Sequence, residues 1–348
     1  MKPTVTYQEI MDASTKKKIC FVDVRSPKEF QQSTIPGAVN IPVLDNQARE
    51  KIGLLYVSGK IDEAKQYGIE WASGQLPSMF AHYQQLLTDF DELTIFCSRG
   101  GMRSNSIYSL LKALGLPVSR LQGGYKAYRH HVVSHLDEEL TKVKFMTLYG
   151  LSGSGKTDIL KELAALGVPV LDLEGCANHR GSLLGSIGLT EPHTQKMFES
   201  LLLDASRQWQ AGATVFTEGE SKRIGRVMMP PSLYTAIQAG EKLLIEADLA
   251  KRVAQIHHDY VVNTDEAELS VTLGQLKRVI NPEKVKLMQG QLEAGAVDQV
   301  IEKLLVSYYD PQYSFHKKTY AATFSNQDSH ETAKAILSWY QGRAKNRV

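Results

Sequence analysis

The segment "YGLSGSGKTDIL", residues 149–160, decides the fold class of the second half of this chain. In it, Gly150 is followed by four residues and then by Gly155, Lys156 and Thr157. Two glycines permit a tight turn whose backbone N–H groups surround phosphate oxygens. The lysine places a positive charge on the outer phosphate, and the threonine hydroxyl can hold Mg²⁺. The spacing therefore predicts a phosphate-binding loop.

The residues around this loop supply the strand and helix that such a loop requires. Residues 143–150 predict a strand and residues 158–166 a helix, and further strands are expected in "VPVLDLE", "ATVFTE" and "KLLIEA". Strands that alternate with helices predict a parallel sheet. Glu218, which ends "ATVFTE", is the best candidate for an acid that holds a metal or its water, although a strand-end glutamate can also be merely solvated.

Two features further along the chain are less specific. Arg252 and Arg278 are candidates for the arginines that lids of small-molecule kinases bring over a phosphate, but each is equally well explained as a surface cation. The tail is expected to be helical, because its apolar residues recur at helical spacing. We interpret this stripe as core or domain packing rather than a ligand site; it consists of Val297, Val300, Ile301, Leu304 and Leu305.

A second motif, "FCSRGGMRS", residues 96–104, centres on Cys97 at the end of a predicted strand. Paired glycines allow the backbone to curl, so that N–H groups, a helix N-terminus and two arginines favour an anion at the sulfur. We expect a thiolate that attacks phosphate or carries a sulfur-like atom. The anion loop comprises Ser98, Arg99, Gly100, Gly101, Met102 and Arg103. Cys20, by contrast, has the surroundings of an inert core cysteine, and a structural role is also favoured for Cys176.

The composition limits the function classes. The 348 residues predict about two domains, and a net charge of +2 leaves any nucleic-acid surface to a local patch. Three cysteines do not predict a disulfide framework, and no apolar run resembles a signal peptide or a membrane span. We therefore expect a soluble, cytoplasmic protein. The polar residues 129–142 are interpreted as a junction between domains at 1–136 and 137–348, and residues 46–92 as helices separated at Gly74 and Pro77.

The first half resembles a rhodanese-like domain. "FVDVRSPKEF", "IPGAVNIP", "FCSRGGMRS" and "LQGGYKAY" occur in rhodanese order and spacing. The resemblance implies that Cys97 is the catalytic cysteine and that Asp23 and Arg25 form a structural pair. Thr34 stands where many rhodaneses have histidine, a position that is not catalytic. The C-x5-R spacing alone also suggests a tyrosine phosphatase, which the surrounding motifs disfavour.

The whole chain resembles the tRNA 2-selenouridine synthase family. The resemblance rests on the domain order and on "DLEGCANHRGS" and "TEGESKRIG" within the second half. One departure is Gly219 with Glu220, where a more acidic run is expected. The family implies an α/β fold with a rhodanese-like parallel-sheet domain, followed by a P-loop NTPase-like α/β domain with a helical C-terminal tail.

That resemblance also implies the chemistry. Wobble 2-thiouridine in tRNA is S-geranylated by geranyl diphosphate, and selenium from selenophosphate then displaces geranyl thiol. The diphosphate-binding residues implied are Gly150, Leu151, Ser152, Gly153, Ser154, Gly155, Lys156 and Thr157. No tightly bound cofactor is expected; Mg²⁺ accompanying the diphosphate would be held by Thr157 and Glu218. Whether Cys97 carries selenium covalently or orients selenophosphate stays open.

The tRNA, through its anticodon loop, is the expected partner, and an enzyme that supplies selenophosphate is a further one. Arg180, Arg223 and Arg226 are the preferred contacts to its phosphate backbone, with a solvated charge as an equal alternative for each. Two other function classes remain open. One is an ATP-dependent tRNA sulfurtransferase with a persulfide on Cys97, and the other is a rhodanese-like sensor fused to a nucleotide switch.

Overall fold

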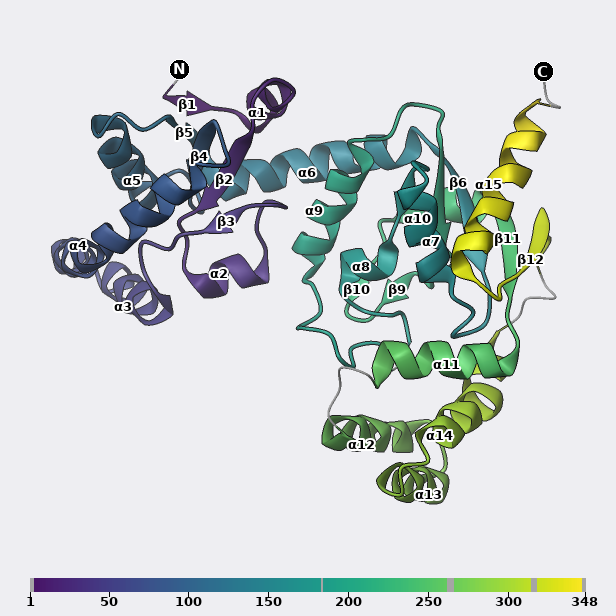
Figure 1. Ribbon diagram of the computed structural model, residues 1–348. Helices are drawn as coiled ribbons and strands as arrows, with labels where there is room; N and C mark the ends of the chain where they lie inside the picture. The colour runs from purple at the N-terminus through teal and green to yellow at the C-terminus, as the bar shows by residue number, and fades with distance from the viewer. Residues whose placement is uncertain (1–2, 183, 262–265, 314–317, 346–348) are drawn as a thin grey trace. The chain divides into compact units, whose positions relative to one another are not determined.

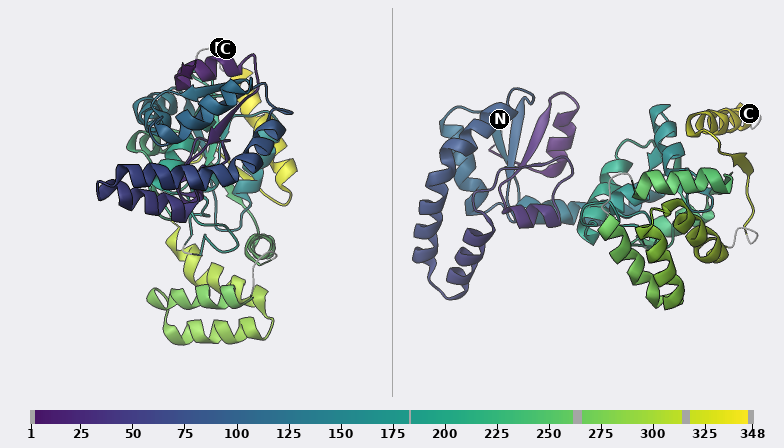
Figure 2. Two further views of the ribbon diagram at one scale, coloured as in Figure 1. Left: turned by 90° about the vertical axis from the view of Figure 1, so that its left-hand side faces the viewer. Right: turned by 60° about the horizontal axis from the view of Figure 1, so that its bottom comes forward.

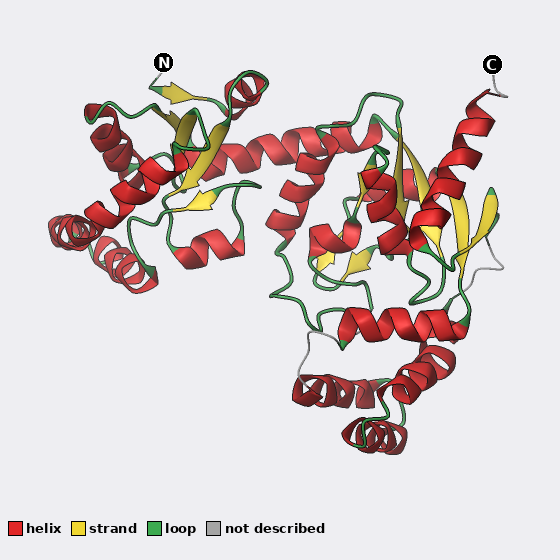
Figure 3. Cartoon of the chain, in the orientation of Figure 1, coloured by secondary structure: helices red, strands yellow, loops and turns green. Residues whose placement is uncertain are grey.

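The computed structural model describes residues 3–182, 184–261, 266–313 and 318–345, and it divides into two compact units. The first comprises residues 1–136 with Glu199–Leu201, and the second residues 137–198 and 202–348. Each unit contains a parallel sheet flanked by helices (Figures 1 and 3). The predicted α/β fold class is therefore confirmed. The polar junction predicted at 129–142 lies mostly in helix α6 (Gly124–Thr141).

The first unit has a five-stranded sheet in the order β1-β5-β4-β2-β3, with every neighbouring pair parallel. Its central strand β4 is buried along its whole length, as expected for a sheet covered on both faces. The strands are β1 (Thr4–Val5), β2 (Ile19–Asp23), β3 (Val39–Asn40), β4 (Glu92–Phe96) and β5 (Val118–Leu121). The helices are α1 (Tyr7–Ser14), α2 (Pro27–Gln32), α3 (Asn46–Val57), α4 (Ile61–Leu86) and α5 (Met102–Ala113).

The predicted break in the helical region at Gly74 and Pro77 is wrong. Helix α4 continues through both residues, with Pro77 inside it, and the break lies between α3 and α4. Gly59 supplies that break, since its φ of +73° is a left-handed conformation that ends a helix. Tertiary packing of the α4 face that carries Met79 and Tyr83 stabilises a helix that local propensity alone disfavours.

The predicted pair of Asp23 and Arg25 is confirmed as a buried ion pair at the end of β2. Arg25 Nη2 lies 2.6 Å from Asp23 Oδ2, and the two residues are 4% and 0% exposed. Thr34 donates its hydroxyl hydrogen to the same carboxylate, and Arg25 also donates to the carbonyl of Ser33. The guanidinium stands 4.2 Å from the centre of the Tyr125 ring. Both charges are therefore compensated inside the unit.

The second unit has a five-stranded parallel sheet in the order β12-β11-β6-β8-β7. Its first strand in the chain, β6, is central, so the connections leave it in both directions. Ligands bind beside the carboxyl ends of strands at such a point. The strands are β6 (Lys144–Tyr149), β7 (Val170–Leu171), β8 (Thr214–Glu218), β11 (Glu241–Glu246) and β12 (Ala322–Ser325).

Alternate side chains of β6 face two different helical layers. Met146 and Leu148 pack with α7 (Lys156–Ala165) and α15 (Ser329–Lys345). Thr147 instead contacts α10 (Pro231–Ala239) through a hydrogen bond to the Ile237 carbonyl. The phosphate loop therefore leaves a strand that is buried on both faces.

The rest of the second unit contains a β-hairpin and, apart from it, four helices that form one group in Figures 1 and 2. The hairpin strands are β9 (Arg223–Ile224) and β10 (Val227–Met228), and two helices, α8 (Leu173–Ala177) and α9 (Gln195–Ser206), precede them. The grouped helices are α11 (Leu249–Tyr260), α12 (Glu266–Gln275), α13 (Pro282–Glu293) and α14 (Val297–Leu304), with short helical turns at Leu276–Arg278, Leu305–Tyr309 and Asp310–Gln312. Over the described residues, no helix has the length and apolarity to cross a membrane.

Arg25→Ala is expected to destabilise the first unit by about 3–5 kcal/mol, because Asp23 would stay buried without its cation. Urea unfolding of the full chain, followed by fluorescence, measures the loss. Removing both charges together in Asp23→Asn/Arg25→Met is expected to cost less than the single change. A double variant as unstable as Arg25→Ala would contradict this account of the pair.

Candidate functional site

The cysteine loop of the first unit lies between β4 and α5. Cys97 is 3% exposed, and its Sγ lies 3.2 Å from the hydroxyl oxygen of Ser104. Burial on its own raises the pKa of the Cys97 thiol. Hydrogen bonds from Ser104 and from the backbone N–H of Arg99, together with the charge of Arg103, outweigh burial, so that this pKa is lowered. The loop therefore favours a thiolate, as the sequence predicts.

The two arginines of this loop have different positions. The Arg99 side chain is exposed, whereas Arg103 is bound by the carboxylate of Glu29, a residue outside the motifs of the loop. Arg103 Nη1 lies 2.6 Å from Glu29 Oε2, and Ser98 donates to the other oxygen of Glu29. Burial on its own raises the pKa of Glu29. The hydrogen bond and the charge of Arg103 outweigh this effect, so that the pKa is lowered to about 2. Glu29 thus orients Arg103 while remaining ionised.

The start of α6 supports the cysteine loop from below. The backbone N–H of Tyr125 donates to the Cys97 carbonyl at 2.8 Å, and that of Lys126 to the Ser98 carbonyl at 2.9 Å. Gly124 has a φ of +60°, and a Cβ on it would lie 2.2 Å from the Cys97 carbonyl oxygen. Gly124, the second glycine of "LQGGY", is therefore required for the loop to close.

The other two cysteines have the opposite electrostatic setting. Cys20 is buried within β2, and burial raises its pKa to about 11. Burial, together with the charges of Asp172 and Glu218, also raises the pKa of Cys176. Both remain thiols at neutral pH, in agreement with the structural roles predicted for them.

The phosphate loop of the second unit runs from the end of β6 to the start of α7. Three of its glycines have no room for a side chain. A Cβ would lie 2.5 Å from the Ile245 carbonyl oxygen at Gly150 and 2.6 Å from the Arg252 carbonyl oxygen at Gly153. At Gly155, which has a φ of +82°, it would lie 2.3 Å from the Asn326 side chain. The close wrap predicted from the sequence is thus set by two backbone carbonyls and one side-chain amide from later segments of the chain.

Arg252 and Asn326 brace this loop from outside. Arg252 donates to the Ser152 carbonyl and forms two hydrogen bonds with Asp310, and Asn326 donates to the Ser154 carbonyl. Arg252 is 4% exposed, so its interpretation as a surface cation is wrong. Its guanidinium is bound by Ser152 and Asp310 and does not line the cavity described below, unlike the lid arginine that was the other expectation. It positions the loop instead. Arg278 is exposed and does not line the cavity described below.

Lys156 and Thr157 occupy the first turn of α7. Lys156 Nζ donates to the carbonyls of Gly150 and Leu151, at 3.0 and 3.3 Å. The Thr157 hydroxyl donates to Glu174 at 3.3 Å. Both side chains line a cavity of about 660 Å³, where the N-terminus of α7 also favours an anion.

Three carboxyl groups gather beside this cavity. Glu218, at the end of β8, is 1% exposed and accepts a hydrogen bond of 2.8 Å from the Glu174 backbone N–H. The alternative interpretation of Glu218 as a solvated strand-end glutamate is therefore wrong. Burial, followed by the charge of Glu220, raises the pKa of Glu174 to about 8. Burial also raises the pKa values of Glu218 and Glu220, and for Glu218 the charges of Asp172 and Glu174 add to the shift. Such crowding favours a bound cation.

The residues present fit a Mg²⁺ that is held mainly by its ligand and by water. Among the side chains that the structure describes, no three histidine, cysteine or acidic groups are arranged to bind one metal ion. Glu218 Oε2, however, is buried without a hydrogen-bond partner in the described part of the chain. Glu174, whose backbone N–H donates to Glu218, accepts the hydroxyl hydrogen of Thr157, which lines the cavity. Mg²⁺ commonly takes one or two protein ligands and completes its shell with phosphate oxygens and water.

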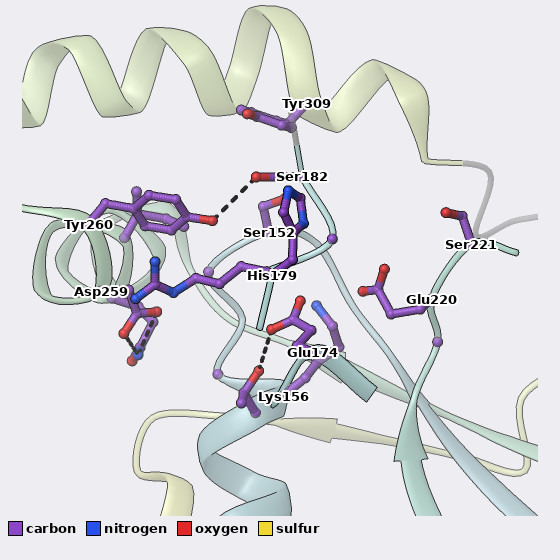
Figure 4. Close-up of a pocket in the computed structure, with 18 of the residues that line it drawn as sticks. Ser152, Lys156, Glu174, His179, Ser182, Glu220, Ser221, Asp259, Tyr260 and Tyr309 are labelled. Carbon is purple, nitrogen blue, oxygen red and sulfur yellow. Dashed lines mark hydrogen bonds between the residues drawn. The ribbon is translucent and has the colours of Figure 1, made fainter. Parts of the chain in front are cut away.

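The two segments that carried the family resemblance, "DLEGCANHRGS" and "TEGESKRIG", meet at this cavity. A Cβ on Gly181 would lie 2.4 Å from Glu220 Oε2, and one on Gly225 would lie 2.6 Å from the His179 ring. Gly219 packs in the same way against the Tyr149 ring. Figure 4 shows Lys156 and Glu174 on one side of the cavity and Ser182, Tyr260 and Tyr309 on another.

The three arginines predicted to contact tRNA do not form one group. Arg180 and Arg223 both line the cavity; Arg180 stacks over the Tyr260 ring and Arg223 is exposed. Arg226 does not line it and donates instead to the carbonyls of Pro192 and His193. The first two remain candidates for a site at the cavity mouth.

Comparisons with known proteins match both units. The family model described as "tRNA 2-selenouridine synthase AAA domain" matches residues 143–346, and that of the rhodanese-like domain matches residues 6–131. A tRNA 2-selenouridine synthase of Cupriavidus necator is 32% identical over 329 residues, covering 86% of this chain and 89% of that protein. One of Hydrogenovibrio crunogenus is 30% identical, with 92% and 96% covered.

Among solved structures, the N-terminal domain of a putative ATP/GTP binding protein from Clostridium difficile is 36% identical to this chain. It covers 37% of this chain and 98% of its own length, with a TM-score of 0.35.

Arg103→Ala is expected to raise the pKa of Cys97, since it removes the cation that favours the thiolate. The alkylation rate of Cys97 by iodoacetamide, measured against pH and mapped by peptide mass analysis, should therefore rise at higher pH than in the parent chain. Arg99→Ala is the matched control, because Arg99 contributes through its backbone N–H. An unchanged profile in Arg103→Ala would remove Arg103 from this role.

Proposed function

Because the chain belongs to the tRNA 2-selenouridine synthase family, we propose that it modifies wobble 2-thiouridine through an S-geranylated intermediate. As a member of that family it is a tRNA-modifying transferase that forms 2-selenouridine. The proposed co-substrates are geranyl diphosphate and selenophosphate. The observation that carries the proposal is the convergence of the phosphate loop, Lys156 and the α7 N-terminus on one cavity.

The geranyl transfer is assigned to the second unit. The sulfur of 2-thiouridine forms a bond to C1 of the geranyl group while the C1–O bond to diphosphate breaks, and the N3 proton of the base is released. Diphosphate departs with the bonding electrons, so negative charge grows next to the loop. Lys156 and the backbone N–H groups of residues 150–157 are positioned to stabilise that charge. Mg²⁺, when bound, would add positive charge there, and Thr157 and Glu218 are the residues proposed to hold it.

The selenium step is assigned to Cys97. S-alkylation makes C2 of the base a better electrophile. The selenium of selenophosphate forms a bond to C2 while the C2–S bond breaks and geranyl thiol leaves, and water then cleaves the Se–P bond to release phosphate and 2-selenouridine. The buried Cys97 loop offers backbone N–H groups, a thiolate and the charge of Arg103 to an anionic selenium donor. These features suit a loop that holds and orients selenophosphate for attack on C2.

A tRNA backbone is expected to meet the cavity of the second unit where Arg180 and Arg223 lie. Arg223 is exposed, and its guanidinium is engaged by the nearby Gly225 carbonyl. Arg180 is held by the Ile187 carbonyl and by Tyr260, which gives it a fixed direction. Such phosphate contacts position a nucleic acid without reading its sequence.

The test of the proposal is stepwise reconstitution with purified full-length chain. Thiolated tRNA, geranyl diphosphate and selenophosphate are added one at a time, and the nucleosides are analysed by mass spectrometry. S-geranyl-2-thiouridine is expected with the first two and 2-selenouridine with all three, in the absence of ATP. A requirement for ATP, with its hydrolysis, would favour the sulfurtransferase alternative instead.

Lys156→Ala is expected to slow geranylation by about 10²–10³, because the leaving diphosphate loses an electrostatic partner. Lys161→Ala on the same helix is the matched control, since Lys161 is exposed and pairs with Asp158. Supplied with tRNA that already carries the S-geranyl group, Lys156→Ala should still exchange selenium. Failure on that substrate would assign Lys156 to folding or tRNA binding.

Cys97→Ser is expected to abolish selenation and leave geranylation largely intact, so S-geranyl-2-thiouridine should accumulate. Nucleoside mass analysis measures both products. Cys20→Ala serves as the control for loss of a buried thiol, and it should form 2-selenouridine normally. Formation of 2-selenouridine by Cys97→Ser at the parent rate would show that the thiolate has no part in the step.

A further inference from the structure

A second, apolar pocket of about 90 Å³ lies in the second unit beside the phosphate-loop cavity. It is enclosed by α11, α12 and α14, by Leu292 of α13 and by the turn that carries Leu184 and Ile187. Part of this lining belongs to a hydrophobic cluster that is separate from the core beneath the sheet, namely Leu184, Ile187, Leu273, Val300 and Leu304. Its interior offers almost no polar group to a ligand, so it suits a hydrocarbon.

The two cavities are continuous in their walls. Five residues line both of them: Ser152, Ser182, Ile256, Tyr260 and Tyr309. Figure 4 shows Tyr260, Ser182 and Tyr309 together, with a hydrogen bond of 3.3 Å between the Ser182 and Tyr260 hydroxyls. Ser152 is itself a member of the phosphate loop. The hydroxyl groups of Ser152, Ser182, Tyr260 and Tyr309 therefore lie where the two cavities meet, between the phosphate loop and the apolar interior. We call this junction the neck.

We infer that this apolar pocket binds the hydrocarbon chain of the prenyl diphosphate whose diphosphate occupies the phosphate loop. The inference rests on the proposed function and adds the location of the chain-binding subsite. A ligand with an anionic head and an apolar tail matches the order of groups along the two cavities. The neck holds its first carbons next to the leaving group, and α11, α12 and α14 surround the rest.

The volume is consistent with a short chain. One water-sized group needs about 10–15 Å³ of such space, so the pocket has room for roughly six to nine of them. A geranyl chain has ten carbons, of which the first remain at the neck beside Ser152. The pocket therefore matches the remaining carbons of that chain.

The apolar stripe of the tail acquires a second role here. The sequence predicts a packing role for this stripe, and Val300 and Leu304 do belong to the hydrophobic cluster. The stripe consists of Val297, Val300, Ile301, Leu304 and Leu305. All five also line the pocket. Helical spacing alone cannot distinguish the two roles, because both need apolar side chains on one face. A pocket appears only where the opposing helices leave a gap.

The binding test compares geranyl diphosphate with inorganic diphosphate, both with Mg²⁺, by titration calorimetry on the full chain. Each buried methylene changes affinity by about fourfold, so the parent chain should prefer geranyl diphosphate by at least about 10²-fold. Val300→Phe fills the pocket and should reduce that ratio at least about tenfold. Val271→Phe on α12 is the matched control, because Val271 is 69% exposed, and it should leave the ratio unchanged. A parental ratio in Val300→Phe, or no preference in the parent chain, would overturn the inference.

A second measurement needs no variant. A geranyl diphosphate analogue with a diazirine at the far end of its chain is bound to the unmodified protein and photoactivated, and the labelled peptides are identified by mass spectrometry. Labels are expected in α11 and α14 and around Leu184. Labelling confined to peptides outside the pocket would overturn the inference.

Transfer to thiolated tRNA separates this inference from the proposed function. If the parent chain geranylates tRNA but Val300→Phe keeps the parental binding ratio, the proposed function stands and the pocket assignment is refuted. If the ratio falls in Val300→Phe but the parent chain transfers nothing to tRNA, the pocket is supported and the proposed reaction is refuted.

Discussion

The phosphate loop depends on a steric constraint: backbone and side chains from three later segments approach three of its glycines too closely for any Cβ. The Ile245 carbonyl, the Arg252 carbonyl and the Asn326 amide stand within 2.6 Å of where those Cβ atoms would lie. Arg252 and Asn326 then hydrogen-bond the loop carbonyls. The loop is therefore shaped by contacts that complete only when β11, α11 and β12 are in place.

The cysteine loop follows the same physical rule with different residues. Gly124 allows α6 to begin directly beneath Cys97, and its neighbours donate to the loop carbonyls. Because those carbonyls already accept hydrogen bonds, the backbone N–H groups of the loop are left to stabilise negative charge on the Cys97 sulfur. Glu29 adds a second constraint, since it holds Arg103 close enough to favour the thiolate while balancing the charge of the guanidinium. In both loops, close packing at glycines fixes a backbone geometry that favours an anion.

The second unit separates polar from apolar recognition. The larger cavity carries Lys156, Thr157 and crowded carboxyl groups, whereas the smaller pocket is lined by aliphatic side chains of α11, α12 and α14. Tyr260 and Tyr309 line both cavities. A tyrosine suits this position because it presents an apolar ring and a polar hydroxyl. The proposed transfer from an amphiphilic donor requires such a division, since binding of the tail would fix the position of the reacting carbon beside the leaving group.

Features that depend on local residue order could be predicted from the sequence. The glycine spacing of residues 150–157, the loop around Cys97 and the alternation of strands and helices were sufficient for the α/β fold and the two loops. Glu29 lies 68 residues before Cys97. Its pairing with Arg103 could not be predicted and is seen only in the folded chain. The same holds for the contact of Arg252 with the phosphate loop and for the hydrogen bond between Glu174 and Glu218. The continuity of α4 through Pro77 and the gap among the tail helices were decided in the same way. The physical reason is that ion pairs, pKa shifts and cavities depend on distances between segments far apart in the chain, which residue order leaves free.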